Sequence, residues 1–272
     1  MSDQTSASAV DLDHCLRAAR RAAEQAIAIT RKSPLGEIRT KSHDADVVTA
    51  IDTGVEEAVR ELINAELPGH VVVGEEYGGT AGAGPTWYCD PVDGTTNLTA
   101  GLPWTSFSLA MAIGRTPLVG VVGDPWRQEI WLTAAGRGVT VNDEPPTVSV
   151  PSSLAGGVVG TEWASSQPWP GMLAFLQSLA DRFCTSRVMG SSTLTLAQVA
   201  VGRTVGAVIG EFHPEDHLAA ALLCQQAGMV IRDEDGNEDP FPERGGILAA
   251  RPEVADQLFE LWQAALPRPG VD

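Results

Sequence analysis

Two aspartates, Asp90 and Asp93, lie three positions apart in the segment CDPVDGTTN. The preceding run TWYC has the composition of a strand, Pro91 interrupts regular pairing, and Gly94 allows a tight turn. We therefore expect both carboxylates to flank a turn at the carboxyl end of a strand. Carboxylates held this close repel each other unless one is protonated or cations bridge them.

The same segment is suited to binding a metal and an oxyanion together. Hard cations such as Mg²⁺ take oxygen ligands and readily share phosphate oxygens. A helix that begins at Gly94, Thr95 and Thr96 would direct its first N–H groups outward, where a phosphate binds without Lys or Arg. In isolation such a turn is common, and Asp93 equally suits the role of a helix N-cap.

Further acids in the sequence make the metal interpretation specific. Glu75 and Glu76 end the apolar run VVVGEE, and Asp216 begins the helical segment in HPEDHLAAALL. Singly, each is an ordinary strand-end acid or a helix N-cap. Together with Asp90 and Asp93, they predict a site in which acids hold cations, and cations with backbone N–H groups hold phosphate.

Two kinds of element must position these acids. Residues 10–31 and 50–67 have helical apolar spacing, and they precede the strand-like runs HVVVGEE, TWYCD, SFSLAMAI, LVGVVGD and EIWLTAA. After residue 150 strands alternate with helices, as expected for an α/β unit. The Pro- and Ser-rich stretch NDEPPTVSVPSSLAGG is the best boundary, so we predict an α+β half over 1–150 and an α/β half over 151–272.

Composition restricts the environment and the partners. The 272 residues carry a formal net charge of -17, which repels nucleic acid and anionic lipid. The first ten residues lack the basic segment and apolar run of a signal peptide, and no apolar run approaches the roughly 20 residues that span a bilayer. The four Cys are scattered, without a zinc or disulfide pattern. We expect a cytoplasmic protein that acts on a small phosphate monoester and binds neither nucleic acid nor membrane.

These segments resemble those of a known family. GEE, DPVDGTTN, and ED followed by HLAAALLCQQAG are similar to three signature segments of the inositol monophosphatase family of Mg²⁺-dependent, lithium-sensitive phosphatases. KSHDADVVTAID resembles a fourth segment, and GSSTLTLAQVAVGRTVG resembles the family's Gly-Ser-Ala-Ala helix. The resemblance covers the chain from about Lys41 to Gly228.

The resemblance implies a layered αβαβα sandwich, usually a homodimer, with the site between the two halves. It implies two or three Mg²⁺ ions. Glu75, Asp90 and the carbonyl of Val92 would bind one ion. Asp90, Asp93 and Asp216 would bind a second, and a third, weaker ion would lie near Glu75.

The resemblance also implies a mechanism. Thr95, hydrogen-bonded to Asp46, would help Glu75 position and deprotonate a water, while the phosphate rests on the N–H groups of Gly94 and Thr95. Elementary chemistry agrees, because two metals stabilise both oxygens of an in-line displacement and no covalent nucleophile is required.

The substrate side departs from the family pattern. Ile209 stands where the family has an acid that contacts inositol hydroxyls, and Glu215 stands where it commonly has Trp. Leu98 replaces an aromatic residue, and Ser192 and Thr193 replace an Ala pair. We expect Ser191, Ile209, Glu215 and the turn residues to contact the substrate.

Several functions remain open from the sequence. We predict a phosphomonoesterase that accepts myo-inositol 1-phosphate without strong preference. Histidinol phosphate, a sugar phosphate such as fructose 1,6-bisphosphate, and 3'-phosphoadenosine 5'-phosphate are alternative substrates, and a non-catalytic regulatory protein is an alternative function. A phosphatase of the haloacid dehalogenase type is disfavoured, because its motif places the two acids two apart rather than three.

Two further features are weak signals. His213 and His217 lie four apart, as helical zinc ligands do, but Pro214 between them argues against a continuous turn. Trp163 and Trp169 lie in an expected irregular loop, where they either approach a ligand or simply pack the loop onto the domain.

Overall fold

The computed structural model describes residues 10–41, 47–147, 151–164 and 167–267. Its helices are α1 (Leu12–Lys32), α2 (Ala50–Glu66), α3 (Thr95–Ala100), α4 (Met172–Ala180), α5 (Ser192–Ala200), α6 (Pro214–Gln226) and α7 (Pro252–Ala265). Its strands are β1 (Arg39–Thr40), β2 (Val47–Val48), β3 (Val71–Gly74), β4 (Pro85–Asp93), β5 (Ser106–Ile113), β6 (Thr116–Asp124), β7 (Glu129–Ala134), β8 (Val139–Val141), β9 (Val158–Thr161), β10 (Thr185–Arg187), β11 (Gly206–Ile209), β12 (Val230–Asp233) and β13 (Ile247–Ala250).

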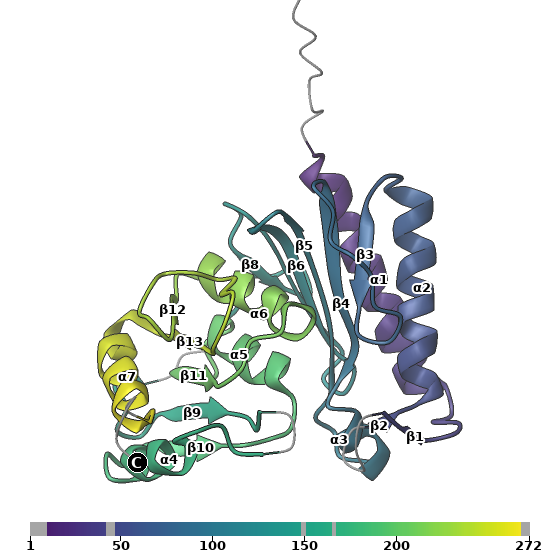
Figure 1. The fold of residues 1–272 in the computed structure, drawn as a ribbon. Helices are drawn as coiled ribbons and strands as arrows, with labels where there is room; N and C mark the ends of the chain where they lie inside the picture. Colours follow the sequence, from purple (N-terminus) through teal and green to yellow (C-terminus); the bar gives the residue numbers. More distant parts are fainter. Residues whose placement is uncertain (1–9, 42–46, 148–150, 165–166, 268–272) are drawn as a thin grey trace, which may run out of the picture.

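Five layers alternate between helix and sheet (Figure 1). Helices α1 and α2 cover one face of a six-stranded sheet with the order β3-β4-β5-β6-β7-β8. Helices α5 and α6 lie between that sheet and a five-stranded sheet with the order β10-β9-β11-β13-β12, and α4 and α7 cover its far face. The predicted αβαβα sandwich is confirmed.

The two helices of the first layer have local reasons to form. Asp11 caps α1 by accepting a hydrogen bond from the backbone N–H of His14 at 3.0 Å. The buried face of α1 consists largely of alanines, which let the helix lie close to the sheet. Thr49 and Asp52 form a capping box at the start of α2, and this local motif determines where the helix begins.

Strand β4 is longer than predicted. It was expected to end at Asp90, but it continues to Asp93, and its pairing with β5 shifts register between these residues. Asp90 faces Ser108 and Asp93 faces Ser106, so one extra residue is accommodated on β4, as in a β-bulge. Residues three apart on a regular strand point to opposite faces. The bulge resets this alternation and allows both carboxylates to reach one pocket.

The two sheets share a buried core. Side chains of the six-stranded sheet, such as Tyr88 and Trp131, belong to the same apolar cluster as Leu218 and Ala219 of α6. Helix α6 therefore packs against both sheets, and its first turn, which carries Asp216, is held beside β4. The strands on either side of the predicted boundary at residue 150 are β8 and β9.

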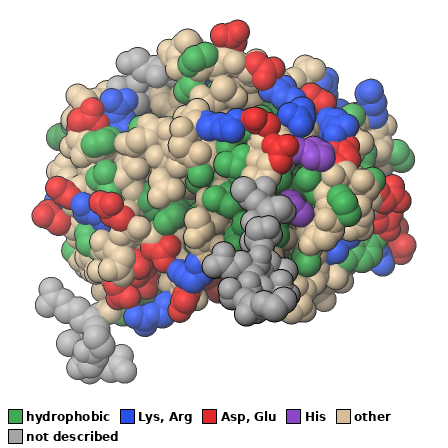
Figure 2. Space-filling view, turned by 90° about the horizontal axis from the view of Figure 1, so that it is seen from above, with side chains coloured by type: hydrophobic (Ala, Val, Ile, Leu, Met, Phe, Trp, Pro, Cys, Tyr) green, Lys and Arg blue, Asp and Glu red, His purple; other side chains and the backbone are tan. Residues whose placement is uncertain are grey.

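The surface seen from above in Figure 1 carries acidic and basic side chains interspersed with apolar ones (Figure 2). Within the described residues, no helix is both long and apolar enough to cross a membrane. All four Cys are buried, free thiols.

Candidate active site

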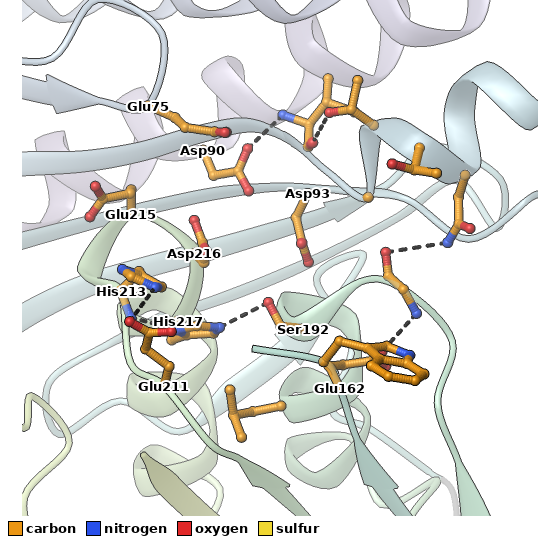
Figure 3. Close-up of a pocket in the computed structure, with 18 of the residues that line it drawn as sticks. Glu75, Asp90, Asp93, Glu162, Ser192, Glu211, His213, Glu215, Asp216 and His217 are labelled. Atoms are coloured by element: carbon orange, nitrogen blue, oxygen red, sulfur yellow. Dashed lines mark hydrogen bonds and ion pairs between the residues drawn. The ribbon is translucent and has the colours of Figure 1, made fainter. Parts of the chain in front are cut away.

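A pocket of about 610 Å³ is lined by residues of both halves of the chain. Asp90, Asp93, Asp216 and Glu75 lie around one space within it (Figure 3). Of the described residues that line the pocket, seven are Asp or Glu and none is Lys or Arg. A phosphate would therefore meet strong repulsion here unless cations were bound.

The carboxylates at the centre of the pocket are forced together. Asp90 is 2% exposed, and its Oδ1 accepts a hydrogen bond from the backbone N–H of Val92 at 2.8 Å. Burial, with the neighbouring charges of Glu75 and Asp216, raises the pKa of Asp90 well above its ordinary value. Burial and the charge of Asp93 raise the pKa of Asp216 in the same way. These shifts indicate a cluster that lacks the positive charge needed to balance it.

Asp93 also joins the two halves. Its Oδ2 accepts hydrogen bonds from Ser191 Oγ at 2.6 Å and from the backbone N–H of Thr193 at 2.7 Å, at the start of α5. Burial raises the pKa of Asp93, although these donors oppose the rise. Ser191 was predicted to contact the substrate, but its side chain is 1% exposed and lies behind Asp93. The neighbouring Ser192 lines the pocket instead.

The turn after Asp93 is held against the other half of the protein. Gly94 adopts a φ of 93°, and a Cβ at this position would lie 2.7 Å from the carbonyl oxygen of Gly190. Asn97 Nδ2 donates to the carbonyl oxygen of Met189 at 2.7 Å. Only glycine suits position 94, because the backbone there has a positive φ and lies close to the carbonyl oxygen of Gly190. The predicted helix at Gly94 is confirmed as α3.

The predicted partner of Thr95 requires a correction. Thr95 Oγ1 donates to Asp52 Oδ1 at 2.8 Å and to the carbonyl oxygen of Val92 at 2.9 Å. Asp46 lies outside the described residues, and among the residues that the structure describes the carboxylate that contacts Thr95 is Asp52. The other oxygen of Asp52 accepts from the backbone N–H of Thr49 at 2.9 Å in the capping box of α2. The start of α2 therefore places this carboxylate beside the pocket.

Glu75 is supported from behind. Lys41 Nζ donates to Glu75 at 2.8 Å and to Glu76 at 2.7 Å. Burial alone would lower the pKa of Lys41, but the two carboxylates hold it above its ordinary value. The fully buried Glu56 accepts from the backbone N–H of Glu76 at 2.7 Å. A Cβ at Gly74 would lie 2.2 Å from Glu56 Oε1, so this glycine admits the supporting carboxylate.

The donor set suits Mg²⁺ chemically. Four carboxylates and the carbonyl group of Val92 provide only oxygen ligands, the type that hard cations prefer. The described residues do not contain a preassembled cluster of three or more His, Cys, Asp or Glu in metal-binding geometry. The fit therefore rests on donor chemistry and on the burial of carboxylates that lack a balancing charge, as shown by Asp90.

The far wall of the pocket comes from the second half of the chain. Ile209 and Glu215 line it, as predicted from the resemblance. Glu211 and Glu162 also line it, and sequence reasoning did not identify them. Glu162 follows β9 and Glu211 lies two residues beyond the end of β11. Strand-end polar residues are the signal that would have found both, since ligands bind at the carboxyl ends of strands in open α/β sheets.

Glu162 holds the loop that approaches α3. Its carboxylate accepts from Thr195 Oγ1 at 2.6 Å and from the backbone N–H of Gly190 at 2.7 Å. Burial raises the pKa of Glu162 to about 7, although these donors oppose the rise. The carboxylate therefore supports the segment that ends at Ser191.

The two tryptophans of the predicted loop have different environments. Trp163 is 49% exposed and lines the pocket. Trp169 is 2% exposed, and its Nε1 donates to Thr161 Oγ1 at 3.0 Å. Trp163 is thus placed to contact a ligand, whereas Trp169 packs the loop onto the domain.

The turn between His213 and His217 is continuous, contrary to the prediction. Pro214 occupies the first turn of α6, where its missing N–H is no loss, and His217 N–H donates to the carbonyl oxygen of His213 at 2.9 Å. Burial lowers the pKa of His217 to about 3. Its Nε2 lies 2.8 Å from Ser192 Oγ.

The fold and the site define a class: five-layered αβαβα proteins with an acidic, oxygen-lined pocket between two sheets. Comparison with known families identifies the particular one. The profile of the inositol monophosphatase family matches residues 10–266, and the chain belongs to this family.

Individual relatives differ in their described roles. The Nus factor SuhB of Pasteurella multocida is 35% identical over 226 residues, which are 81% of this chain and 84% of that protein. Inositol monophosphatase 1 of Solanum lycopersicum is 31% identical over 227 residues, which are 80% of this chain and 83% of that protein. Relatives of this chain thus include a protein named for a phosphatase activity and one named as a Nus factor.

Solved structures agree on the fold. The inositol monophosphatase from Anabaena sp. PCC 7120 superposes with a TM-score of 0.81 at 30% identity, covering 95% of this chain and 98% of that chain. An IMPase/NADP phosphatase complexed with Mg²⁺ and phosphate has a TM-score of 0.77 at 19% identity, covering 94% of this chain and 97% of that chain. The second similarity concerns the fold alone.

Proposed function

We propose that this protein is a Mg²⁺-dependent phosphomonoesterase that hydrolyses a small alcohol phosphate with a water molecule as the nucleophile. One observation carries the proposal: four carboxylates from both halves surround a pocket whose described lining contains no Lys or Arg. Such a pocket attracts cations and accepts a phosphate only with them. Family membership supports the same activity.

The residues that would hold the cations are those of the central cluster. Glu75, Asp90 and the Val92 carbonyl group would hold one ion, and Asp90, Asp93 and Asp216 would hold a second, with a third near Glu75. When bound, Mg²⁺ lowers the pKa of water and compensates the charge of the phosphate and the leaving oxygen.

Thr95 and Asp52 would act on the water. Because the Thr95 hydroxyl donates to Asp52 Oδ1, its oxygen lone pairs remain available to accept a hydrogen bond from a water in the pocket. Glu75 also lines the pocket and would orient that water and take up its proton. The backbone at Gly94 and Thr95 would bind the phosphate oxygens.

The alcohol specificity follows from the far wall. Ile209 removes a hydroxyl acceptor, while Glu215 and Glu211 add carboxylates. A site built to pair a hydroxyl discriminates strongly, whereas an apolar wall rejects little. We therefore propose that myo-inositol 1-phosphate is accepted without strong preference and that a phosphate of a cationic alcohol, such as histidinol phosphate, is favoured.

A regulatory role is the second candidate, because a relative at 35% identity is named as a Nus factor. In that case the fold would bind a macromolecular partner and hydrolysis would be dispensable. A hydrolysis-deficient variant separates the two functions. The Asp216→Asn variant is expressed in a strain that lacks the gene. If it restores the wild-type phenotype, the physiological role depends on binding rather than on hydrolysis.

The activity itself is tested by phosphate release. Purified protein with Mg²⁺ is assayed against myo-inositol 1-phosphate, histidinol phosphate, fructose 1,6-bisphosphate and 3'-phosphoadenosine 5'-phosphate, before and after chelation. We expect hydrolysis of at least one ester, with loss on chelation and recovery on adding Mg²⁺. Release that persists after thorough chelation would contradict the proposal.

A further inference from the structure

A buried histidine and a serine on the pocket wall form a hydrogen-bonded pair. His217, in α6, is 2% exposed, and its Nε2 lies 2.8 Å from Oγ of Ser192 at the start of α5. Both residues line the pocket, and the contact between them is drawn in Figure 3. We refer to them as the His217–Ser192 pair. Sequence reasoning noted each residue separately but did not connect them.

The backbone determines where the ring carries its proton. The N–H of His213 donates to Nδ1 of His217 at 2.8 Å, so Nδ1 uses its lone pair and bears no hydrogen. A neutral imidazole then carries its hydrogen on Nε2. Nε2 must therefore donate to Ser192 Oγ rather than accept from it.

This direction fixes the role of the serine hydroxyl. Since Ser192 Oγ accepts from the ring, its own hydrogen must point to another acceptor. Within the described part of the chain, His217 is the one hydrogen-bond partner of the Ser192 side chain, and Ser192 faces the pocket. The hydroxyl is thus aligned to donate to a group inside the pocket.

The position of Ser192 indicates which part of a substrate it would meet. The backbone N–H groups expected to bind phosphate belong to the start of α3, whereas Ser192 lies at the start of α5. Ser192 belongs to the second half of the chain, as do Ile209, Glu211 and Glu215 of the far wall. The acids there accept hydrogen bonds and Ile209 offers none, so Ser192 adds a directed donor to that wall.

We propose that Ser192 is a specificity-determining residue that donates a hydrogen bond to an oxygen atom in the alcohol part of the substrate, and that His217 is a positioning residue that keeps its hydroxyl in this direction. The proposal rests on the proposed phosphomonoesterase activity. It identifies the substrate class as alcohol phosphates with a further oxygen acceptor near the ester.

The kinetic test compares two esters that share a ring. Myo-inositol 1-phosphate carries hydroxyls next to the ester, and cyclohexyl phosphate carries none. Ser192→Ala should lower kcat/KM for myo-inositol 1-phosphate more than kcat/KM for cyclohexyl phosphate. We expect the ratio of the two values to fall about three- to tenfold, which is the effect of losing one neutral hydrogen bond. Ser178→Ala, on the outer helix α4, is the matched control and should leave the ratio between the two esters unchanged.

The histidine is tested by coupling. His217→Leu should reduce the same ratio, because the Ser192 hydroxyl is then free to rotate, and adding it to Ser192→Ala should cause no further reduction. His217→Gln, whose amide can accept from His213 and donate to Ser192, should recover most of the loss caused by His217→Leu. An equal fall on both esters in Ser192→Ala, or full additivity of the two variants, would overturn the proposal.

A spectroscopic test does not depend on turnover. Long-range ¹H–¹⁵N correlation spectra distinguish the two nitrogens of each histidine, and His217→Gln identifies the signals of His217. We expect the Nε2–H form with or without Mg²⁺, and a ring protonated on Nδ1 would overturn the proposed direction of donation. If wild-type protein releases no phosphate from any ester while His217 shows the Nε2–H form, the phosphatase proposal fails but the hydrogen-bond direction stands.

Discussion

The two walls of the pocket are constructed differently. On the side of the six-stranded sheet, the reactive groups are fixed by hydrogen bonds: Asp90 by Val92 N–H, Thr95 by Asp52 and Glu75 by Lys41. On the side of the five-stranded sheet, Trp163 is 49% exposed and Glu211 is also exposed, and they follow strand ends rather than lie within them. The second wall thus includes exposed side chains beside buried ones such as Ile209.

This difference separates chemistry from selectivity. Ligands that must meet a small cation need positions accurate to a fraction of an ångström, which buried and hydrogen-bonded side chains provide. A wall that contacts the alcohol can change without disturbing them. The departures from the family pattern at Ile209, Ser192 and Glu215 all lie on this second wall.

Removing a central carboxylate should have the largest effect. We expect Asp216→Asn to lower kcat/KM about a hundredfold or more, because a metal ligand acts on the transition state. The metal-free variant should be at least as stable as wild type, since one of several repelling buried charges is removed. Phosphate release and thermal unfolding in chelator measure both effects, with Asp256→Asn on the exposed surface of α7 as control. Near-normal turnover would mean that Asp216 is not a ligand.

A second prediction distinguishes the two candidates for the partner of Thr95. Asp52→Asn should reduce kcat about a hundredfold, the typical contribution of proton transfer. The kcat is calculated from the concentration of folded protein. The capping box also weakens, so stability should fall by about 1 kcal/mol. Asp46→Asn is the comparison variant, and its loss of kcat should be smaller. An equal or larger loss for Asp46→Asn would restore the role that the resemblance gave to Asp46.

A third prediction concerns charge on the far wall. If Glu215 attracts a cationic alcohol, Glu215→Gln should lower kcat/KM for histidinol phosphate about fivefold relative to myo-inositol 1-phosphate, the scale of a partly exposed ion pair. Glu260→Gln, on the outer helix α7, makes the same charge change away from the pocket. If the wild type instead prefers myo-inositol 1-phosphate by a hundredfold or more, on the order of 3 kcal/mol, the proposed specificity is wrong.

The last prediction is a pH dependence of stability. Burial raises the pKa of Glu162 from an ordinary 4.5 to about 7, so the folded state holds this proton more tightly than the unfolded state. The stabilisation is complete below the ordinary pKa and is lost as the pH rises through about 7. Between these values wild type should lose stability relative to Glu162→Gln by on the order of 1 kcal/mol per pH unit. Chemical denaturation of both proteins from acid to neutral pH measures this difference, and parallel curves would contradict it.

Much of the fold was predictable because it depends on local patterns. The helices predicted over 10–31 and 50–67 are α1 and α2. The alternation predicted after residue 150 corresponds to the elements from β9 to α7, except that β10 and β13 were not predicted and β13 follows β12 without a helix between them. The short pair β1 and β2 was not predicted, because two-residue strands give no periodic signal. The end of β4 was misplaced, since a bulge across Pro91 extends the pairing. Homodimerisation stays a prediction that light scattering would test.

The sequence by itself determined which residues form the central cluster. Strand-end acids, a glycine turn and an acid in the first turn of a helix are local features, and the resemblance related them to one another. The partners of those residues depended on tertiary structure. The contact of Asp52 with Thr95 spans 43 positions, that of Ser191 with Asp93 spans 98, and that of His217 with Ser192 spans 25. Such contacts form only when α2, α3, β4, α5 and α6 pack together, so no local pattern could specify which side chain donates to which.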